Sequence, residues 1–433
     1  MKLTGTKAFT LLLSSQSLSL LGSGMTRFAL LIWAYEKEGT ATALALLGFF
    51  ITTAYVIASP IAGVFVDRWD RRKVLLFSDL GSGMMTAMML LLFLSGELQL
   101  WHLYLMEGIA GILEAFQDPA FSASVSLLVP KETYTRSNAW VGLGRSITRL
   151  LAPALAGLLL QSNGLAVVML ADLGTLALAL VSLFFLRIPP PPPSQEGQQA
   201  SGNFFKQMAF GMRYILQRPG LRGILFILFL INLFGTITYF AIQAPMILAR
   251  SGGNELDLGL VRSVMGIGGI AGGIGVVLWV RKSRNRVKTF LISTMLSFLI
   301  GDLITALSRG AIGWAIAGFF AEFTIPFIIS PYYALWQELV PPDVQGRVFS
   351  SRDMIQIGAQ PIGYLLGGLL ADGVFEPALA QGGALSSSFG LLVGTGPGAG
   401  MAAMFLCTAI LGCLVGVLGL LNPHIRRLES DKN

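Results

Sequence analysis

The stretch that decides the fold is Gly63-Val-Phe-Val-Asp67-Arg68-Trp-Asp70-Arg71-Arg72-Lys73. Apolar residues flank it over 42–66 and 74–94, and each flank is long enough to cross a bilayer, which takes about 20 residues. Six charges in the seven residues 67–73 cannot lie in hydrocarbon, so this turn lies in water. Because basic residues in short loops mark the cytoplasmic side, the stretch predicts two membrane spans joined by a cytoplasmic turn.

The composition extends this prediction to the whole chain. Its 433 residues are 54% hydrophobic and only 12% charged, whereas soluble domains carry about 25% charged residues. We therefore expect an all-α membrane protein that crosses the bilayer many times. The sequence shows no nucleotide-binding loop and no His, Cys or Asp cluster at catalytic spacing, so neither ATP-driven transport nor an enzyme is expected.

Twelve apolar stretches have the length of a span. We expect helices over 9–35, 42–66, 74–94, 99–122, 137–161, 164–185, 222–249, 258–280, 287–307, 311–336, 349–371 and 398–421. The first could be a cleaved signal peptide, but its apolar part is too long for one. The glycine-rich stretch 266–275 predicts close packing of its helix against a neighbour.

A change of composition divides the chain near its middle. Five consecutive prolines, 189–193, precede the polar run 194–199, which together predict a stiff and then a flexible linker. Residues 203–217 mix large apolar residues with bases, as in a helix that lies at the membrane surface. We expect an N-terminal six-helix bundle over 1–187, a cytoplasmic linker over 188–221 and a C-terminal six-helix bundle over 222–433.

The distribution of basic residues predicts the orientation. Of the 30 lysines and arginines, 23 fall at the two ends and in alternate loops, four in the other loops and three inside spans. This asymmetry favours an even number of spans with both termini in the cytoplasm.

An internal repeat supports two related halves. Val129-Pro130 lies six residues before Arg136, and Val340-Pro341 lies six before Arg347, an offset of about 211 residues. At nearly the same offset, residues 275–285 correspond to residues 63–73, and Trp279 stands at the position that corresponds to Asp67. Parallel repeats of six spans each are a known transporter architecture.

The pattern of 63–73, Gly-x-x-x-Asp-Arg-x-x-Arg-Arg-Lys, is more specific than a generic basic turn. It resembles the signature between the second and third helices of the major facilitator superfamily. Ala115-Phe-Gln-Asp118-Pro119-Ala, the run 336–350 and the run 361–372 resemble the drug:proton antiporter branch that includes macrolide efflux permeases.

The resemblance implies a fold and a function. The fold is two pseudo-symmetric bundles of six helices. The function is secondary active export of amphipathic small molecules, driven by a proton gradient without any other cofactor. Its partners are protons, a small-molecule substrate and the bilayer, with no nucleic acid. It further implies a monomer in the inner membrane of a bacterium. An uptake carrier, a lipid transporter and a non-transporting sensor stay open as alternatives.

Two motifs depart from the family pattern. Ala152-Pro153-Ala-Leu-Ala156-Gly157 is a loosened form of the Gly-Pro-x-x-Gly-Gly antiporter motif, in which Pro153 and Gly157 are retained. On the fourth helix, the family's Arg-x-x-x-Gly becomes Glu107-x-x-x-Gly111.

Charged side chains inside spans are candidates for function by default, because burying them in hydrocarbon is costly. The candidates for substrate binding or proton coupling are Arg27, Glu107, Glu114, Arg145, Arg149 and Glu322. A structural alternative pairs Glu114 with Arg145 or Arg149, which lie one turn apart on one helix face. Asp79, near the inner end of its helix, is expected to extend towards the membrane surface, and Asp172 is expected to be structural.

A proton carrier must change its charge during the cycle. Burial favours the neutral form of a carboxyl group, whereas a nearby arginine favours the charged form. We expect Arg145 and Arg149 to keep Glu114 ionised, and we see no such base near Glu322 on its helix. Glu322 is therefore the first candidate for proton coupling.

The charged turn is the candidate gate. By resemblance, Gly63, Asp67, Arg68, Arg71 and Arg72 brace the two halves in one end state. An arginine of this turn should pair with the inner end of the fourth helix, where Asp118 is the available acid.

Overall fold

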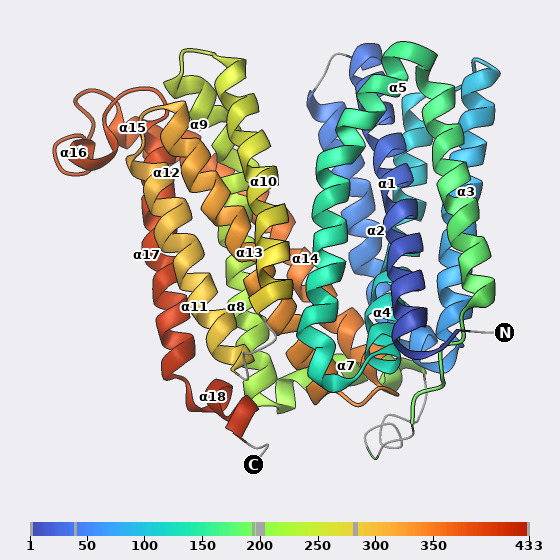
Figure 1. Ribbon diagram of the computed structural model, residues 1–433. Helices are drawn as coiled ribbons and strands as arrows, with labels where there is room; N and C mark the ends of the chain where they lie inside the picture. Colours follow the sequence, from blue (N-terminus) through green and yellow to red (C-terminus); the bar gives the residue numbers. More distant parts are fainter. Residues whose placement is uncertain (1–2, 39–40, 193–194, 196–203, 280–284, 431–433) are drawn as a thin grey trace. The chain divides into compact units, whose positions relative to one another are not determined.

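The computed structural model describes residues 3–38, 41–192, 195, 204–279 and 285–430, and these residues are almost entirely helical (Figure 1). Within those ranges, β-pairing is limited to an isolated bridge between Leu3 and Leu186. The predicted all-α class is confirmed.

The chain forms two compact units. Unit 1 comprises Met1–Ile215 and Trp336–Met354, and unit 2 comprises Leu216–Leu335 and Ile355–Asn433. The segment Trp336–Met354, which contains the end of one long helix and the start of the next, thus packs with the N-terminal helices of unit 1. The division at 187 and 222 inferred from composition stays a prediction.

The helices of unit 1 follow the predicted spans closely. They are α1 (Gly5–Glu38), α2 (Ala41–Arg68), α3 (Arg71–Leu94), α4 (Leu100–Leu128), the short η1 (Lys131–Thr133), α5 (Tyr134–Phe185) and α7 (Phe204–Gln217). α5 contains two predicted spans, which meet at Gly164. Gly164 has φ +77°, a left-handed conformation that glycine adopts without the steric penalty of a side chain.

Unit 2 holds the remaining helices, apart from the ends of α13 and α14 that belong to unit 1. They are α8 (Pro219–Gly235), η2 (Thr236–Ile242), α9 (Gln243–Arg250), α10 (Glu255–Trp279), α11 (Arg286–Leu296), η3 (Ser297–Asp302), α12 (Leu303–Leu307), α13 (Ala311–Leu339), α14 (Gln345–Leu370), η4 (Ala371–Phe375), α15 (Glu376–Leu379), α16 (Gly390–Val393), α17 (Ala399–Leu421) and α18 (Pro423–Ser430). η2, η3 and η4 are π-helical turns inside or at the end of longer helices.

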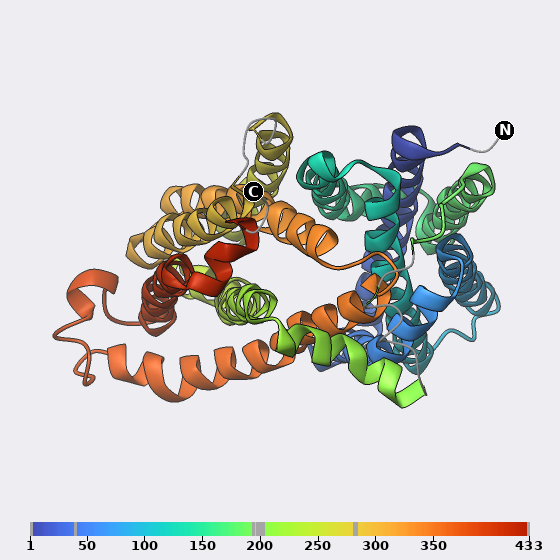
Figure 2. The same cartoon turned by 90° about the horizontal axis from the view of Figure 1, so that it is seen from below.

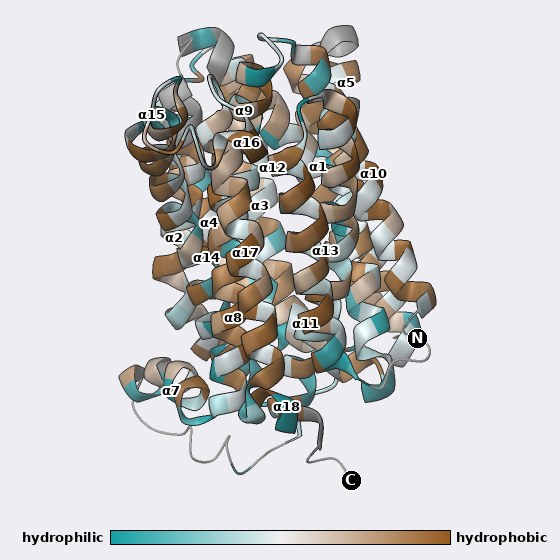
Figure 3. Ribbon diagram, turned by 90° about the vertical axis from the view of Figure 1, so that its left-hand side faces the viewer, coloured by the Kyte–Doolittle hydropathy of each residue, from teal (hydrophilic) through white to brown (hydrophobic). Residues whose placement is uncertain are grey.

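Eleven helical stretches among the described residues are long and apolar enough to cross a membrane. α4 is also long enough, with 29 residues, but Glu107, Glu114 and Asp118 lower its hydrophobicity. Its acids lie on the interior side, as described below. Apolar residues cover most of the long helices, whereas the short α18 is mainly hydrophilic and α7 mixes both kinds (Figure 3).

Small residues set the closest helix contacts. A side chain at Gly22 of α1 would meet Thr175 Oγ1 of α5 at 2.1 Å, and one at Gly111 of α4 would meet the carbonyl oxygen of Ile51 in α2 at 2.1 Å. In unit 2, side chains at Gly268 and Gly272 of α10 would come within 2.3 Å of α13 backbone oxygens. The predicted close packing of 266–275 is therefore confirmed.

α7 differs from the long helices of unit 1 because it crosses their ends rather than running beside them (Figure 2). Its Phe205 is 76% exposed. The opposite side packs tightly: a side chain at Gly211 would meet the carbonyl oxygen of Arg347 at 2.1 Å. This position agrees with the surface helix expected over 203–217, and its apolar exposed side fits a bilayer surface.

Candidate functional site

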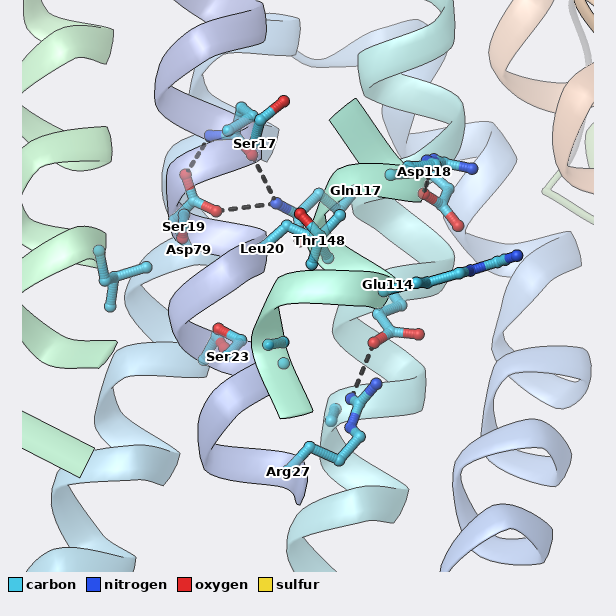
Figure 4. A pocket seen from close by; sticks show the side chains of 18 of the residues that line it. Ser17, Ser19, Leu20, Ser23, Arg27, Asp79, Glu114, Gln117, Asp118 and Thr148 are labelled. Carbon is cyan, nitrogen blue, oxygen red and sulfur yellow. Dashed lines mark hydrogen bonds and ion pairs between the residues drawn. The ribbon is translucent and has the colours of Figure 1, made fainter. Parts of the chain in front are cut away.

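A cavity of about 580 Å³ lies in unit 1 and is lined by residues of α1, α3, α4 and α5 (Figure 4). Much of its wall is apolar, with Leu20, Phe28 and Leu31 among the lining residues. The charged residues of the lining are Arg27, Asp79, Glu114, Asp118, Arg145 and Arg149. The cavity thus brings together five of the charged residues expected to be functional and adds Asp79.

Arg27 of α1 binds two acids of α4. Its Nη2 lies 3.0 Å from Glu114 Oε1 and its Nε lies 3.3 Å from Glu107 Oε1. The two glutamates are seven residues apart and so share a helix face. The side chain of Glu107 is 16% exposed and that of Glu114 is 40% exposed. The unusual Glu107 therefore faces a base on a neighbouring helix.

The alternative that pairs Glu114 with Arg145 or Arg149 is not what the structure shows, because Glu114 pairs with Arg27. Arg145 Nη2 instead binds Asp118 Oδ1 at 3.1 Å. Arg149 lines the same cavity and has no ion pair among the described residues. The error arose because proximity along the chain was taken as proximity in space, whereas Glu114 is nearer to α1.

The antiporter-like motif contributes to the cavity wall through Ala152 and Pro153. A side chain at Gly24 of α1 would lie 3.1 Å from the Cβ of Ala152, and Ala156 is fully buried. A side chain at Gly157 would meet nothing within 4 Å. Within this motif, the close contact with α1 is therefore made at Ala152 rather than at Gly157.

Asp79 is held by two amides. Gln16 Nε2 of α1 donates to Asp79 Oδ2 at 2.7 Å, and Gln117 Nε2 of α4 donates to Oδ1 at 2.8 Å (Figure 4). The residue is 2% exposed, so the expected extension towards the membrane surface is wrong. The sequence placed Asp79 near a helix end but carried no sign that Gln16 and Gln117 converge on it.

Asp172 has the structural environment expected of it. Ser23 Oγ donates to its Oδ1 at 3.0 Å and Thr86 Oγ1 donates to its Oδ2 at 2.9 Å. It is 2% exposed and joins α1, α3 and α5.

The charged turn makes a second polar site in unit 1, at the segment Trp336–Met354. The side chain of Asp67, 1% exposed, accepts three hydrogen bonds. Gly346 N donates to Oδ1 at 2.6 Å, and Arg347 donates to Oδ2 from its N at 3.0 Å and its Nε at 2.8 Å. A side chain at Gly63 would lie 2.8 Å from the Cα of Arg347, which explains why a glycine is needed there.

The arginines of the turn bind backbone oxygens. Arg71 donates to the carbonyls of Ala123, at 2.9 Å, and Pro342, and Arg72 Nε donates to the carbonyl of Leu183 at 2.5 Å. Arg68 Nε donates to Gln207 Oε1 of α7 at 3.0 Å.

Arg71 thus reaches the inner part of α4 as expected, but through Ala123 O rather than Asp118. α4 continues to Leu128, beyond the predicted end at 122, and Asp118 therefore lies deeper, beside Arg145. Sequence reasoning also missed Arg347 as the partner of Asp67. Its place in the repeat, as the counterpart of Arg136, was the available signal.

Glu322 lies in unit 2, in the middle of α13. Arg262, which lies inside α10, attracts Glu322 electrostatically. α13 itself carries no lysine or arginine, as the sequence indicated, but the comparison with bases was limited to that one helix and so overlooked this residue of α10.

The sequence of this chain matches a known family of membrane transporters. Residues 12–364 match the model of the Major Facilitator Superfamily. The chain belongs to this superfamily. Its family and fold are those of a multi-pass membrane transporter rather than an enzyme, and its relatives include efflux proteins.

One relative is macrolide efflux protein A of Streptococcus pyogenes, 28% identical over 366 residues, which cover 83% of this chain and 88% of the relative. Another is the multidrug efflux pump Tap of Mycolicibacterium fortuitum, 23% identical over 418 residues, with 94% of each chain covered. Among solved structures, the E. coli fucose:proton symporter has a TM-score of 0.67 at 13% identity, with 95% of this chain and 98% of the symporter covered. The structural likeness supports the superfamily fold.

Proposed function

We propose that this transporter exports amphipathic small molecules that carry a positive charge, in exchange for protons and by alternating access. The observation that carries the proposal is the cavity of about 580 Å³ in unit 1, whose apolar wall holds two accessible carboxylates. Glu114 and Asp118 have side chains 40% and 42% exposed, so both can reach a bound cation. Macrolide and multidrug efflux relatives support the direction and the substrate class.

The arginine pairs explain how one site could accept and release a cation. Exposed ion pairs contribute about 1 kcal/mol or less, so a substrate ammonium can compete with Arg27 for Glu114 or with Arg145 for Asp118. The apolar wall would supply most of the affinity and little selectivity, as an exporter of varied compounds requires.

The turn at 63–73 supplies the conformational step. Because Asp67 binds Gly346 and Arg347 with three hydrogen bonds, it holds Trp336–Met354 against the other helices of unit 1. We propose that this segment is released once per cycle, as movement between two end states requires. We place both termini and the linker 188–221 in the cytoplasm, in the inner membrane of a bacterium, with a monomer as the working form.

A second candidate function is export of anionic compounds. Arg149 lines the cavity and has no ion pair among the described residues, so it could bind a carboxylate. The carboxylates of the same cavity would repel an anionic substrate. A comparison of the transport of cationic and anionic compounds distinguishes the two candidate functions.

The test is transport by purified protein in liposomes with an acidic lumen. Ethidium is a suitable probe because its charge is permanent, so it cannot be trapped by protonation as an amine would be. We expect ethidium to accumulate in the lumen, and a protonophore or protein-free liposomes to abolish accumulation. Equal accumulation with and without the pH gradient would reject antiport, and uptake of a fluorescent organic anion instead would favour the second candidate.

A further inference from the structure

We propose that Asp79 is the group that takes up and releases the exchanged proton. This inference rests on the proposed proton antiport and identifies the residue that couples it. Asp79 lines the cavity of unit 1 and is nevertheless 2% exposed.

The partners of Asp79 are neutral. Each carboxylate oxygen accepts one hydrogen bond from an amide, at 2.7 Å from Gln16 and 2.8 Å from Gln117. Gln117 Nε2 also donates to Gln16 Oε1 at 2.9 Å. The three residues form a closed polar cluster that joins α1, α3 and α4.

The charged groups around the cavity are engaged elsewhere or lie apart from this cluster. They are Arg27 on α1, Glu114 and Asp118 on α4, and Arg145, Arg149 and Asp172 on α5. Arg27 binds the glutamates of α4, and Arg145 binds Asp118. Among the described residues, the hydrogen-bond partners of Asp79 are its two amides and no ion pair involves it.

The buried, uncharged surroundings of Asp79 favour a carboxyl group that gains and loses a proton. An ionised carboxylate buried without a cation costs several kcal/mol, and protonation removes most of that cost. Asp79 can therefore gain a proton without breaking an ion pair, whereas protonation of Glu114 or Asp118 would weaken an existing ion pair with Arg27 or Arg145. On release, the O–H bond of the carboxylic acid breaks, the proton passes to water in the cavity, and the carboxylate retains both amide hydrogen bonds.

Gln117 connects the proton to the substrate. It lies on α4 between Glu114 and Asp118, the carboxylates that we propose to bind the cation. A substrate that shifts this turn of α4 shifts a hydrogen-bond donor of Asp79, so substrate binding and proton release become linked.

The test measures proton and substrate movement separately in proteoliposomes. The variant is Asp79→Asn, which is neutral and of similar shape. Asp172→Asn is the matched control, because Asp172 is equally buried and bound by neutral donors but is not among the residues that line the cavity. One assay follows exchange of ethidium for ethidium without a gradient, and the other follows lumenal pH as ethidium enters an acidic lumen.

We expect Asp79→Asn to keep ethidium exchange but to lose both accumulation driven by the pH gradient and the rise in lumenal pH. Asp79→Glu should restore part of the proton-driven flux, and Asp172→Asn should keep it. Full proton-driven accumulation in Asp79→Asn would overturn the assignment while leaving antiport intact.

Two other results also count against Asp79. Equal loss in Asp172→Asn would mean that any buried acid of this unit is needed structurally. A wild-type protein without coupled proton movement would overturn the proposed antiport and this inference with it. If Asp79→Asn does not fold, Asp79→Glu decides: a shifted pH profile of transport supports the assignment, and an unchanged profile rejects it.

Discussion

Replacing Asp67 by asparagine should release Trp336–Met354 from the rest of unit 1. The carboxylate is 1% exposed and accepts three hydrogen bonds, two of them from Arg347. Removing one member of a buried ion pair costs about 3–5 kcal/mol. Since each 1.4 kcal/mol is a factor of ten, the attached state should lose roughly a hundred- to a few thousand-fold in its equilibrium with the released state.

Thiol labelling can measure that change. Ser350 is 1% exposed and lies against Gly63, so Ser350→Cys should react slowly with a maleimide while the segment is attached. In a background without Cys407 and Cys413, adding Asp67→Asn should raise the labelling rate at least tenfold.

The matched control is Asp70→Asn. Asp70 lies in the same turn, but its Oδ1 accepts a hydrogen bond from Arg72 N and caps α3, and asparagine caps helices equally well. Labelling should stay at the original rate in this control. An unchanged rate in Asp67→Asn would refute the role of Asp67 in holding the segment.

Four further outcomes follow from the same account. Glu114→Gln should weaken ethidium binding about tenfold, as loss of about 1.4 kcal/mol implies, measured by fluorescence titration; unchanged affinity would remove Glu114 from the binding site. Gly111→Ala should lower the melting temperature, because its Cβ would press on the α2 backbone at a cost of about 1–3 kcal/mol, whereas Gly108→Ala, with nothing within 4 Å, should not. Ser194→Cys, at a position outside the described residues, should resist an impermeant thiol reagent applied to intact cells, and ready labelling would reverse the predicted topology. Glu322→Gln should keep transport driven by the pH gradient, because we assign the exchanged proton to Asp79 of unit 1; loss of that transport with ethidium exchange kept would return the role to Glu322.

The sequence was sufficient for the helical membrane fold because its signals do not depend on which helices are in contact. Span length predicts the helices, alternating basic loops predict their orientation, and the repeat at an offset of about 211 residues predicts two related halves. The π-helical turns in unit 2 were not predicted, since their sequence has the same apolar pattern as an ordinary span.

The sequence did not predict which residues the charged side chains contact. Arg27 binds acids of α4, and Asp79 binds glutamines of α1 and α4. These contacts depend on the rotation of each helix about its axis. In a hydrophobic bundle with small residues at many contacts, a single sequence does not determine that rotation. The sequence therefore identified the charges that lie inside spans, but it did not predict several of their pairs.

Simultaneous recording of ethidium entry and lumenal pH in proteoliposomes tests the central claim most directly. With an acidic lumen, the account predicts that ethidium entry and a rise in lumenal pH share one time course, with a fixed ratio of protons to ethidium. Ethidium entry without any change of lumenal pH beyond the passive leak of protein-free liposomes would contradict it.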